Sequence, residues 1–310
     1  MNFAFIIGGL VLLILGGNWL LKSAVALSLQ LNIPKIVIGM TVVSFATSAP
    51  ELIVSLNAAL NGSPDLALAN VIGSNIANLG LVLGITLLFG KMEVQKSFYQ
   101  TDWPVMMIAS LLLYLFLSDD QVIARYEGVI LFTLLILFLV YLLRSKKTTV
   151  IDELPEEGGS LSVIKIIGYL FIGGFGLWVG SELLIKGATS LAQEFGVSER
   201  IIGVTVVSIG TSIPELAASI IAVIKKEKAI SLGNLIGSNV FNILAVLGIT
   251  SMVTPVALSD QGLLTNDVFW MLGVSFLILP LVFLPKKYLL DWKHGVVLLV
   301  VYGAFIYMTI

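Results

Sequence analysis

Two stretches of the sequence place a carboxylate inside an otherwise apolar run. SFATSAPEL lies in the first half of the chain and SIGTSIPEL in the second, and in each a glutamate directly follows a proline: Glu51 after Pro50, and Glu215 after Pro214. Neither glutamate has a cationic residue at helical spacing in its own segment. A carboxylate inside a membrane costs roughly 2.5 to 3.5 kcal/mol and is usually functional and partnered. The pattern therefore favours a mobile cation as the partner of both glutamates.

The prolines and the hydroxyls beside them extend this interpretation. A proline donates no N–H and its ring clashes with the carbonyl four residues earlier, so the carbonyls of Ala46 and Gly210 should lose their helical partners. In lipid such oxygens need another partner. Carbonyls, hydroxyls and carboxylates together form an all-oxygen ligand set, which suits a hard cation such as calcium or sodium. The hydroxyls next to the prolines belong to Ser44, Thr47, Ser48, Ser208, Thr211 and Ser212.

Spacing predicts how the hydroxyls and carboxylates lie relative to one another. Thr47 and Glu51 are four residues apart, as are Thr211 and Glu215. Residues four apart lie on one face of a helix, so we expect each pair to project from a common face.

A second pair of blocks adds neutral oxygens. LANVIGSNIANL and LGNLIGSNVFNI recur with the same separation as the glutamate blocks, and in them Ser74 is four residues before Asn78, as Ser238 is before Asn242. A GSN sequence alone could serve only to pack helices, as small residues in membrane helices often do. Its duplication in register with the glutamate blocks favours a role in binding.

The composition identifies the class of protein. Of 310 residues 58% are hydrophobic and only 12% charged, and the mean hydropathy is +1.04. Such a chain is an all-α polytopic membrane protein. The net charge of -2 indicates no electrostatic partner such as a nucleic acid, and the absence of cysteine excludes disulfides and thiolate metal sites. The apolar N-terminus lacks the features of a signal peptide and is expected to be a retained first helix.

Apolar runs of about 20 residues predict ten transmembrane helices. One polar segment divides them into five and five, so the expected units are a first repeat at 1–144, a cytoplasmic linker at 145–161 and a second repeat at 162–310. The ten predicted spans are 3–28, 36–60, 66–89, 103–117, 123–143, 163–192, 201–224, 230–253, 268–284 and 295–309.

The positions of lysine and arginine predict the orientation. Cytoplasmic loops collect basic residues. With both termini outside, only Arg125 and Arg200 fall in external loops. The remaining loop lysines and arginines then lie inside: Lys35, Lys91, Lys96, Arg144, Lys146, Lys147, Lys165, Lys225, Lys226, Lys228, Lys286, Lys287 and Lys293.

The second half repeats the first. Between Gly39 and Leu56 the chain matches residues 203–220 at eleven of eighteen positions, at a constant offset. Because each half is predicted to hold five spans, the second copy must enter the membrane from the opposite side. Such inverted repeats are typical of secondary transporters, which use them for alternating access to a midplane site.

With both blocks in view, the chain resembles the cation/calcium antiporter superfamily, and most closely the prokaryotic sodium/calcium exchangers. The resemblance covers nearly the whole chain and rests on two long motifs, GMTVVSFATSAPEL and the GSN block, each present twice in closely similar form. It implies that the second, third, seventh and eighth helices form neighbouring cation sites at the midplane. The first and sixth helices would slide across them as a pair.

Carried over by position, the resemblance implies a ligand set. Calcium would be held by Glu51 and Glu215 together with the backbone oxygens of Thr47 and Thr211. Sodium would in addition use the side chains of Thr47, Ser48, Thr211, Ser212, Ser74 and Ser238 and the carbonyls of Ser44 and Ser208.

One position departs from some relatives. They carry an aspartate where this sequence has Asn242, the counterpart of Asn78 in the first half. Both asparagines stay in the predicted ligand set, but the site then has two carboxylates rather than three. A single calcium ion would neutralise it.

These observations predict a multi-pass antiporter of the cell membrane that exchanges sodium for calcium. Its partners are the transported cations and the lipid bilayer, with no cofactor and no obligatory protein partner. A proton/calcium antiporter using the same two glutamates is the alternative, because two carboxylates in one buried site increase each other's proton affinity. A passive channel could use the same ligands without a counter-ion. An enzyme is disfavoured, since no histidine pair, Ser–Lys or Asp–Asp arrangement with hydrolytic context is present.

Overall fold

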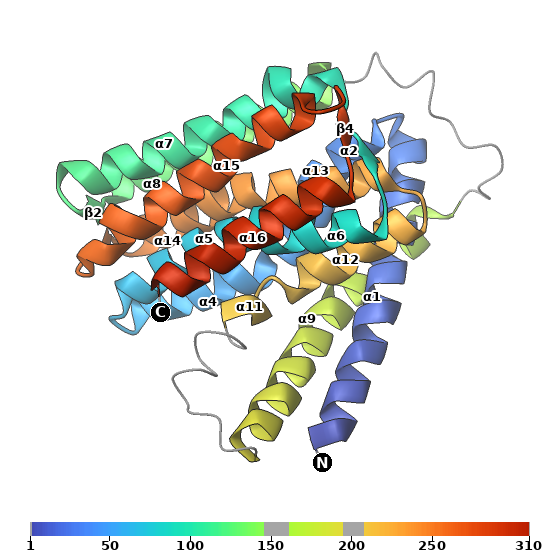
Figure 1. Cartoon of the computed structure of the whole chain (residues 1–310), viewed down its shortest axis with the longest axis horizontal. Helices are drawn as coiled ribbons and strands as arrows, with labels where there is room; N and C mark the ends of the chain where they lie inside the picture. The colour runs from blue at the N-terminus through green and yellow to red at the C-terminus, as the bar shows by residue number, and fades with distance from the viewer. Residues whose placement is uncertain (1, 146–160, 195–207, 310) are drawn as a thin grey trace.

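The computed structural model describes residues 2–145, 161–194 and 208–309, and it is almost entirely helical (Figure 1). The described part contains eight helices long and apolar enough to cross a membrane, and one further pair of helices bent by 45°. Nine of the ten predicted spans overlap these elements. The eight helices are Asn2–Leu31, Pro64–Phe89, Phe98–Asp119, Arg125–Arg144, Val163–Leu191, Lys228–Val253, Leu263–Phe283 and Trp292–Thr309, and the bent pair is Lys35–Thr47 with Ala49–Leu60.

The seventh predicted span, at 201–224, begins outside the described residues. Its described part comprises α11 (Ser208–Gly210) and α12 (Ile213–Ile224), which is too short to cross a bilayer by itself. Most of the predicted linker, and Arg200 of the predicted external loop, also lie outside the described residues.

Two long helices form the centre of the molecule. Their most apolar windows are 78% and 83% buried within the protein, whereas the other six spans have 28–33% of theirs buried. Helices buried on all sides belong to the interior of a bundle, and half-buried ones to its lipid-facing rim. The first central helix consists of α5 (Pro64–Ala77), η2 (Asn78–Val82) and α6 (Leu83–Phe89), and the second of α13 (Lys228–Phe241), η6 (Asn242–Leu247) and α14 (Gly248–Val253).

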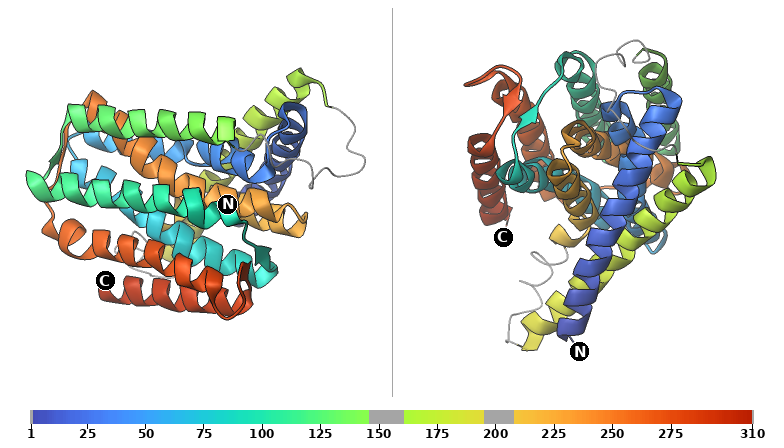
Figure 2. Two further views of the ribbon diagram at one scale, coloured as in Figure 1. Left: turned by 90° about the horizontal axis from the view of Figure 1, so that it is seen from above. Right: turned by 90° about the vertical axis from the view of Figure 1, so that its right-hand side faces the viewer.

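Helices α1 (Asn2–Leu31) and α9 (Val163–Glu194) lie side by side and cross the bundle at an angle (Figures 1 and 2). Glycines allow their backbones to touch. A Cβ on Gly16 would lie 2.7 Å from the Leu177 nitrogen, and a Cβ on Gly173 would lie 2.6 Å from the Leu20 nitrogen. Any larger side chain at these positions would force the two helices apart.

Each end of this helix pair carries a cation–π contact. The Nζ atom of Lys22 lies 4.9 Å from the centroid of the Tyr169 ring, and that of Lys186 lies 5.1 Å from the centroid of the Phe5 ring. The two lysines stand at equivalent positions of the two sequence repeats, and so do the two aromatic residues. A cation over an aromatic face is attracted by the ring quadrupole, so both contacts hold α1 against α9.

The outer helices are joined by two short antiparallel ladders, which the sequence did not predict. Strand β1 (Met92–Glu93) pairs with β4 (Leu289–Leu290), and β2 (Val122–Ile123) pairs with β3 (Val256–Ala257). Each ladder connects a loop of the first half with a loop of the second. The helices next to these loops are η3 (Phe98–Asp102) with α7 (Trp103–Asp119), α8 (Arg125–Ser145), η7 (Leu263–Asp267) with α15 (Val268–Phe283), and α16 (Trp292–Thr309).

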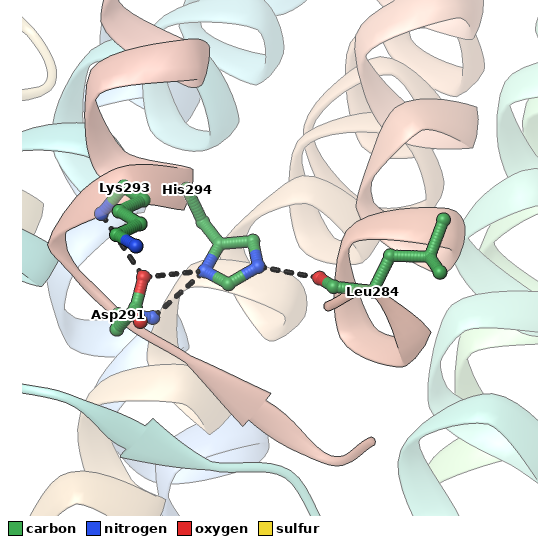
Figure 3. A network of polar contacts seen from close by, with 4 residues as sticks. All are labelled: Leu284, Asp291, Lys293 and His294. Carbon is green, nitrogen blue, oxygen red and sulfur yellow. Dashed lines mark hydrogen bonds and ion pairs between the residues drawn. The ribbon is translucent and has the colours of Figure 1, made fainter. Parts of the chain in front are cut away.

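The single histidine of the chain has a structural place at the start of α16 (Figure 3). His294 Nε2 donates to the Leu284 carbonyl at 2.6 Å, and Nδ1 lies 2.9 Å from Asp291 Oδ1. Asp291 Oδ1 also accepts the backbone N–H of Lys293 at 3.0 Å. The imidazole therefore ties the end of α15 to the beginning of α16, well away from the two glutamates in sequence.

Candidate functional site

The first proline begins a new helix instead of interrupting one. Helix α3 (Ser44–Thr47) follows α2 (Lys35–Ile38) and η1 (Gly39–Val43) and ends at Thr47, and α4 (Ala49–Leu60) begins directly after Ser48. Pro50 lies in the first turn of α4, where a missing N–H costs nothing because that N–H has no helical partner anyway.

This break corrects the expectation that Thr47 and Glu51 share one helix face. Thr47 is the last residue of α3 and Glu51 lies in the first turn of α4, on a helix bent by 45° from the first. The end of a helix leaves its last carbonyls without helical partners, so several oxygens around Thr47 become available rather than the one that proline geometry alone predicts.

The second half has the same arrangement. Helix α12 begins after Ser212 with Pro214 in its first turn. The carbonyl of Gly210, which was predicted to need a new partner, accepts a hydrogen bond of 2.9 Å from the hydroxyl of Ser181 on α9. Of the predicted carbonyl ligand Ser208, the structure shows only that it begins α11, because residues 201–207 lie outside the described part.

Both glutamates are fully buried, with 0% of their surface exposed. Each stands in the first turn of a helix, where unpaired backbone N–H groups favour negative charge. Ser48, three residues before Glu51, donates a hydrogen bond of 3.3 Å to Glu215 Oε1 and so joins the two glutamate blocks. Residues from the two halves of the sequence are thus brought into a single site.

Hydroxyls from both halves surround Glu215. Ser48 and Ser238 donate to its Oε1 at 3.3 and 3.5 Å. The hydroxyl of Thr47 lies 3.4 Å from that of Ser238. On the other side, the hydroxyls of Ser74 and Thr211 are 3.5 Å apart.

Several buried oxygens of this site have no hydrogen-bond partner. Buried polar atoms in proteins are nearly always paired, because an unpaired one retains its desolvation cost. Here both carboxylate oxygens of Glu51 lack a partner, and Glu215 is only half satisfied. The unpartnered side-chain oxygens of predicted ligands are Glu51 Oε1 and Oε2, Glu215 Oε2, Ser212 Oγ, Asn78 Oδ1 and Asn242 Oδ1. A hard cation would satisfy such a set.

The two predicted asparagine ligands begin wide helical turns. Asn78 is the first residue of the π-helical segment η2, and Asn242 the first of η6. Such π-bulges occur frequently at functional sites. Asn242 Nδ2 donates to Asn75 Oδ1 at 3.1 Å, which orients the amide and leaves its own oxygen unpaired.

Sequence reasoning missed two further asparagines that support the site. Asn234 Oδ1 accepts a hydrogen bond from the Thr47 hydroxyl at 3.2 Å, and its Nδ2 lies 3.5 Å from Ser219 Oγ. Asn70 makes the corresponding contact with Ser55 at 2.9 Å. Both asparagines stand at the same place in the duplicated blocks, and this recurrence was a signal that could have identified them.

Ser44 differs from the other predicted ligands. Its hydroxyl is 2.9 Å from both the Gly39 carbonyl and the Asn234 carbonyl, and thus links η1 to the central helix α13. A Cβ on Gly237 would lie 2.6 Å from backbone atoms of Met40, so this contact depends on glycine. The Ser44 carbonyl accepts the Ser48 N–H at 2.9 Å and the Thr47 hydroxyl at 3.4 Å.

The charge of the site is limited to two carboxylates. Within the described ranges, no group of three or more histidine, cysteine, aspartate or glutamate side chains could hold a metal ion. The oxygens that accompany Glu51 and Glu215 are hydroxyls, amides and carbonyls. Two carboxylates with neutral oxygens match the charge of one calcium ion.

Comparison with known proteins gives one consistent result. The family described as sodium/calcium exchanger protein matches residues 1–144 and 165–310. The chain is 36% identical to the inner membrane protein YrbG of Escherichia coli, over 88% of this chain and 86% of the relative. It is 27% identical to the sodium/calcium exchanger MaX1 of Methanosarcina acetivorans, over 98% and 97% of the two chains.

Solved structures agree with these sequence matches. The sodium-calcium exchanger NCX_Mj, soaked with zero Na⁺ and Ca²⁺, superimposes with a TM-score of 0.84 at 28% identity, over 100% of this chain and 99% of the other. Its structure soaked with 2.5 mM Na⁺ and 0.1 mM Ca²⁺ superimposes with a TM-score of 0.82. The similarity therefore extends over both halves of the chain.

Proposed function

Because the chain belongs to the sodium/calcium exchanger protein family, we propose that it couples sodium movement down its gradient to the transport of calcium in the opposite direction. The chain is a multi-pass membrane protein and a cation/calcium antiporter, not an enzyme. Sodium as the driving ion and the residues that bind the ions are the parts that we propose.

One observation carries the proposal. Two fully buried carboxylates, one from each half of the chain, have oxygens without a hydrogen-bond partner, and Ser48 of the first half donates to Glu215 of the second. A permanent positive side chain would neutralise them, but a transporter needs a positive charge that can leave. Calcium fits because it takes six to eight oxygen ligands and prefers carboxylates, carbonyls and hydroxyls.

Competition for this site supplies the coupling. Sodium ions in the neighbouring sites would share Glu51, Glu215 and the Thr47 backbone oxygen with calcium, so the two ions cannot bind together. A ligand shifts a conformational equilibrium only through its different affinity for the two states. Moving two bare carboxylates past apolar helices is costly, so the loaded site moves and the unloaded site does not.

The two halves are proposed to form an inverted repeat of five helices each, with both termini outside. Recurrence of elements at the offset of the sequence repeats supports this arrangement: η2 and η6 begin at Asn78 and Asn242, and β1 and β3 at Met92 and Val256. In this scheme the α1–α9 pair moves across the central helices and exposes the site to one side at a time. Its glycine contacts support movement of the pair as one body.

Calcium uptake into proteoliposomes tests the driving ion. Vesicles are loaded with sodium, with potassium, or with buffer that imposes only a proton gradient, and radioactive calcium is added outside. We expect uptake only from the sodium-loaded vesicles. Uptake that needs a proton gradient and no sodium would identify a proton/calcium antiporter instead, and uptake that needs no counter-ion would identify a channel.

A further inference from the structure

A groove of about 650 Å³ opens on the outer surface beside the cation site. It lies between four parts of the fold: the broken helix η1–α4, the middle of α8, the middle of α9, and the segment η6–α14 of the second central helix. Its walls are almost wholly apolar. Aromatic rings stand around it, and Phe45, Phe171 and Phe175 expose 61%, 71% and 62% of their surface.

The groove lies at mid-depth in the membrane. On α8 it is lined by residues between Phe132 and Leu139, which start seven residues from the beginning of that helix at Arg125. At 1.5 Å per residue this is roughly 10 Å from the helix end. Hydrocarbon fills a bilayer at this depth, and lipid headgroups do not reach it.

The walls exclude water as the occupant. A bound water needs two to four polar partners, and this groove offers hardly any. An empty space of this size would leave the lining side chains without the dispersion contacts that a close-packed interior provides. A flexible hydrocarbon chain supplies those contacts. Since lipid tails are as apolar as the walls, close packing rather than the hydrophobic effect would retain the chain there.

We propose that this groove is a binding site for one acyl chain of a membrane phospholipid. The site has a direct connection to the cation site, because Ser48 and Pro50 form part of its wall and the Ser48 hydroxyl also donates to Glu215. One wall belongs to α9. A Cβ added to Gly174 of this helix would lie 3.6 Å from the Cβ of Ala46. If α9 slides as proposed above, the shape of the groove changes with each transport step.

Two matched tryptophan substitutions on α8 test the site. Ile136 lines the groove and Ile130 does not, although both are exposed to a similar extent, 44% and 42%. Ile136→Trp should fill the groove, and Ile130→Trp should not. The protein is reconstituted in 1-palmitoyl-2-oleoyl-phosphatidylglycerol, extracted in mild detergent and weighed by native mass spectrometry with its retained lipids.

We expect the wild type and Ile130→Trp to retain one phospholipid that Ile136→Trp loses. Phe171→Ala removes an exposed aromatic ring from the groove wall without adding bulk, and it should weaken lipid retention as well. This second variant tests the site even if Ile136→Trp does not fold. Equal retention by all variants would overturn the proposal. Equal retention of the short-chain lipid dioctanoyl-phosphatidylglycerol would also overturn it, because the headgroup rather than the acyl chain would then be bound. A protein dimer that Ile136→Trp dissociates would overturn it as well, because a second copy of the protein would then occupy the groove.

Lipid retention does not depend on the transported ions, so this result is separate from the proposed function. Calcium exchange measured on the same variants shows whether the bound lipid affects transport. We expect Ile136→Trp to change the exchange rate and Ile130→Trp to leave it unchanged, because only the former restricts the space between α9 and the broken helix.

Discussion

At the scale of single residues, the two glutamates differ in how the protein holds them. Glu215 receives hydrogen bonds from Ser48 and Ser238, whereas both oxygens of Glu51 are unpaired. Serine hydroxyls orient the first carboxylate before an ion arrives. In the proposed site, the Glu51 carboxylate would have the ion as its partner.

Replacing either carboxylate by its amide should abolish calcium exchange. Glu51→Gln and Glu215→Gln keep the side-chain shape and remove one of the two charges that face a desolvated divalent ion. Loss of one partner from a buried charge pair costs roughly 2–5 kcal/mol, so calcium uptake at a fixed low concentration should fall at least about 30-fold. Asn57→Ala, at an exposed position of α4, is the control. Exchange retained by either glutamine variant would contradict the two-carboxylate site.

The asparagine at 242 sets the number of negative charges. Asn242→Asp replaces an amide, whose Oδ1 has no hydrogen-bond partner, by a third carboxylate. A third negative charge binds an additional cation or a proton, so the dependence of calcium uptake on internal sodium or on pH should change while the thermal stability stays similar. Titration of uptake against sodium at several pH values measures this. An identical ion dependence would place Asn242 outside the site.

Asp291 gives a prediction of stability against pH, outside the membrane-spanning segments. Partial desolvation tends to raise the pKa of Asp291, but the hydrogen bond from the Lys293 N–H, the charge of His294 and the hydrogen bonds with His294 outweigh it and lower this pKa below its ordinary value of 3.8. A carboxylate with a lower pKa in the folded state stabilises the protein above its unfolded-state pKa. That contribution is lost as the pH falls through the folded-state pKa.

We therefore expect Asp291→Asn to lower the melting temperature at pH 7 and to make a smaller difference near pH 3. Differential scanning fluorimetry in detergent at both pH values measures the two differences. Glu93→Gln, on the opposite strand β1, serves as a control for the loss of a negative charge nearby. If Asp291→Asn lowers the melting temperature by the same amount at low pH, the hydrogen bonds of the Asp291 carboxylate in Figure 3 are not the cause of the difference.

At the scale of elements, glycines determine how α1 and α9 pack. Gly16 faces the backbone of α9, whereas a Cβ at Gly8, on the same helix, would have no atom within 4 Å. At Gly16 the interface has no room for a side chain, whereas Gly8 borders open space.

Gly16→Leu should separate the two helices, and Gly8→Leu should be neutral. Overpacking of a close interface costs roughly 1–3 kcal/mol or forces the backbones to shift, so Gly16→Leu should lower the melting temperature and slow calcium exchange at least several-fold. Both quantities are measured on the same preparations. Equal behaviour of the two leucine variants would show that the tight α1–α9 contact is not needed for transport.

At the scale of the whole molecule, the two halves interlock instead of packing as separate domains. Helix α1 lies on α9, η1 contacts α13, and each strand ladder takes one strand from each half. The candidate cation site likewise includes side chains from both halves. Each half alone would expose surfaces that the other half covers.

Co-expression of residues 1–145 and 161–310 as two chains should therefore give an assembled, active transporter, and either chain alone should not be stable. Affinity purification through a tag on one chain, followed by calcium uptake into proteoliposomes, measures both points. Recovery of a monodisperse first half by itself would contradict the interlocked arrangement.

The sequence by itself determined the class of protein and the approximate positions of nine spans, and it singled out the two glutamate blocks as the candidate site. Hydropathy and recurrence are local properties of the chain, and they survive any change of packing. The recurrence of the blocks predicted that Glu51, Ser48, Ser238 and Asn78 belong to one site.

Only the tertiary structure decided which oxygens meet and which stay unpaired. The break at Ser48 puts Thr47 and Glu51 on different helices, because a proline begins a helix more easily than it continues one. The support of Thr47 by Asn234, the two strand ladders and the apolar groove depend on contacts between residues far apart in the sequence. No local pattern encodes such contacts, since they arise from how whole helices pack against one another.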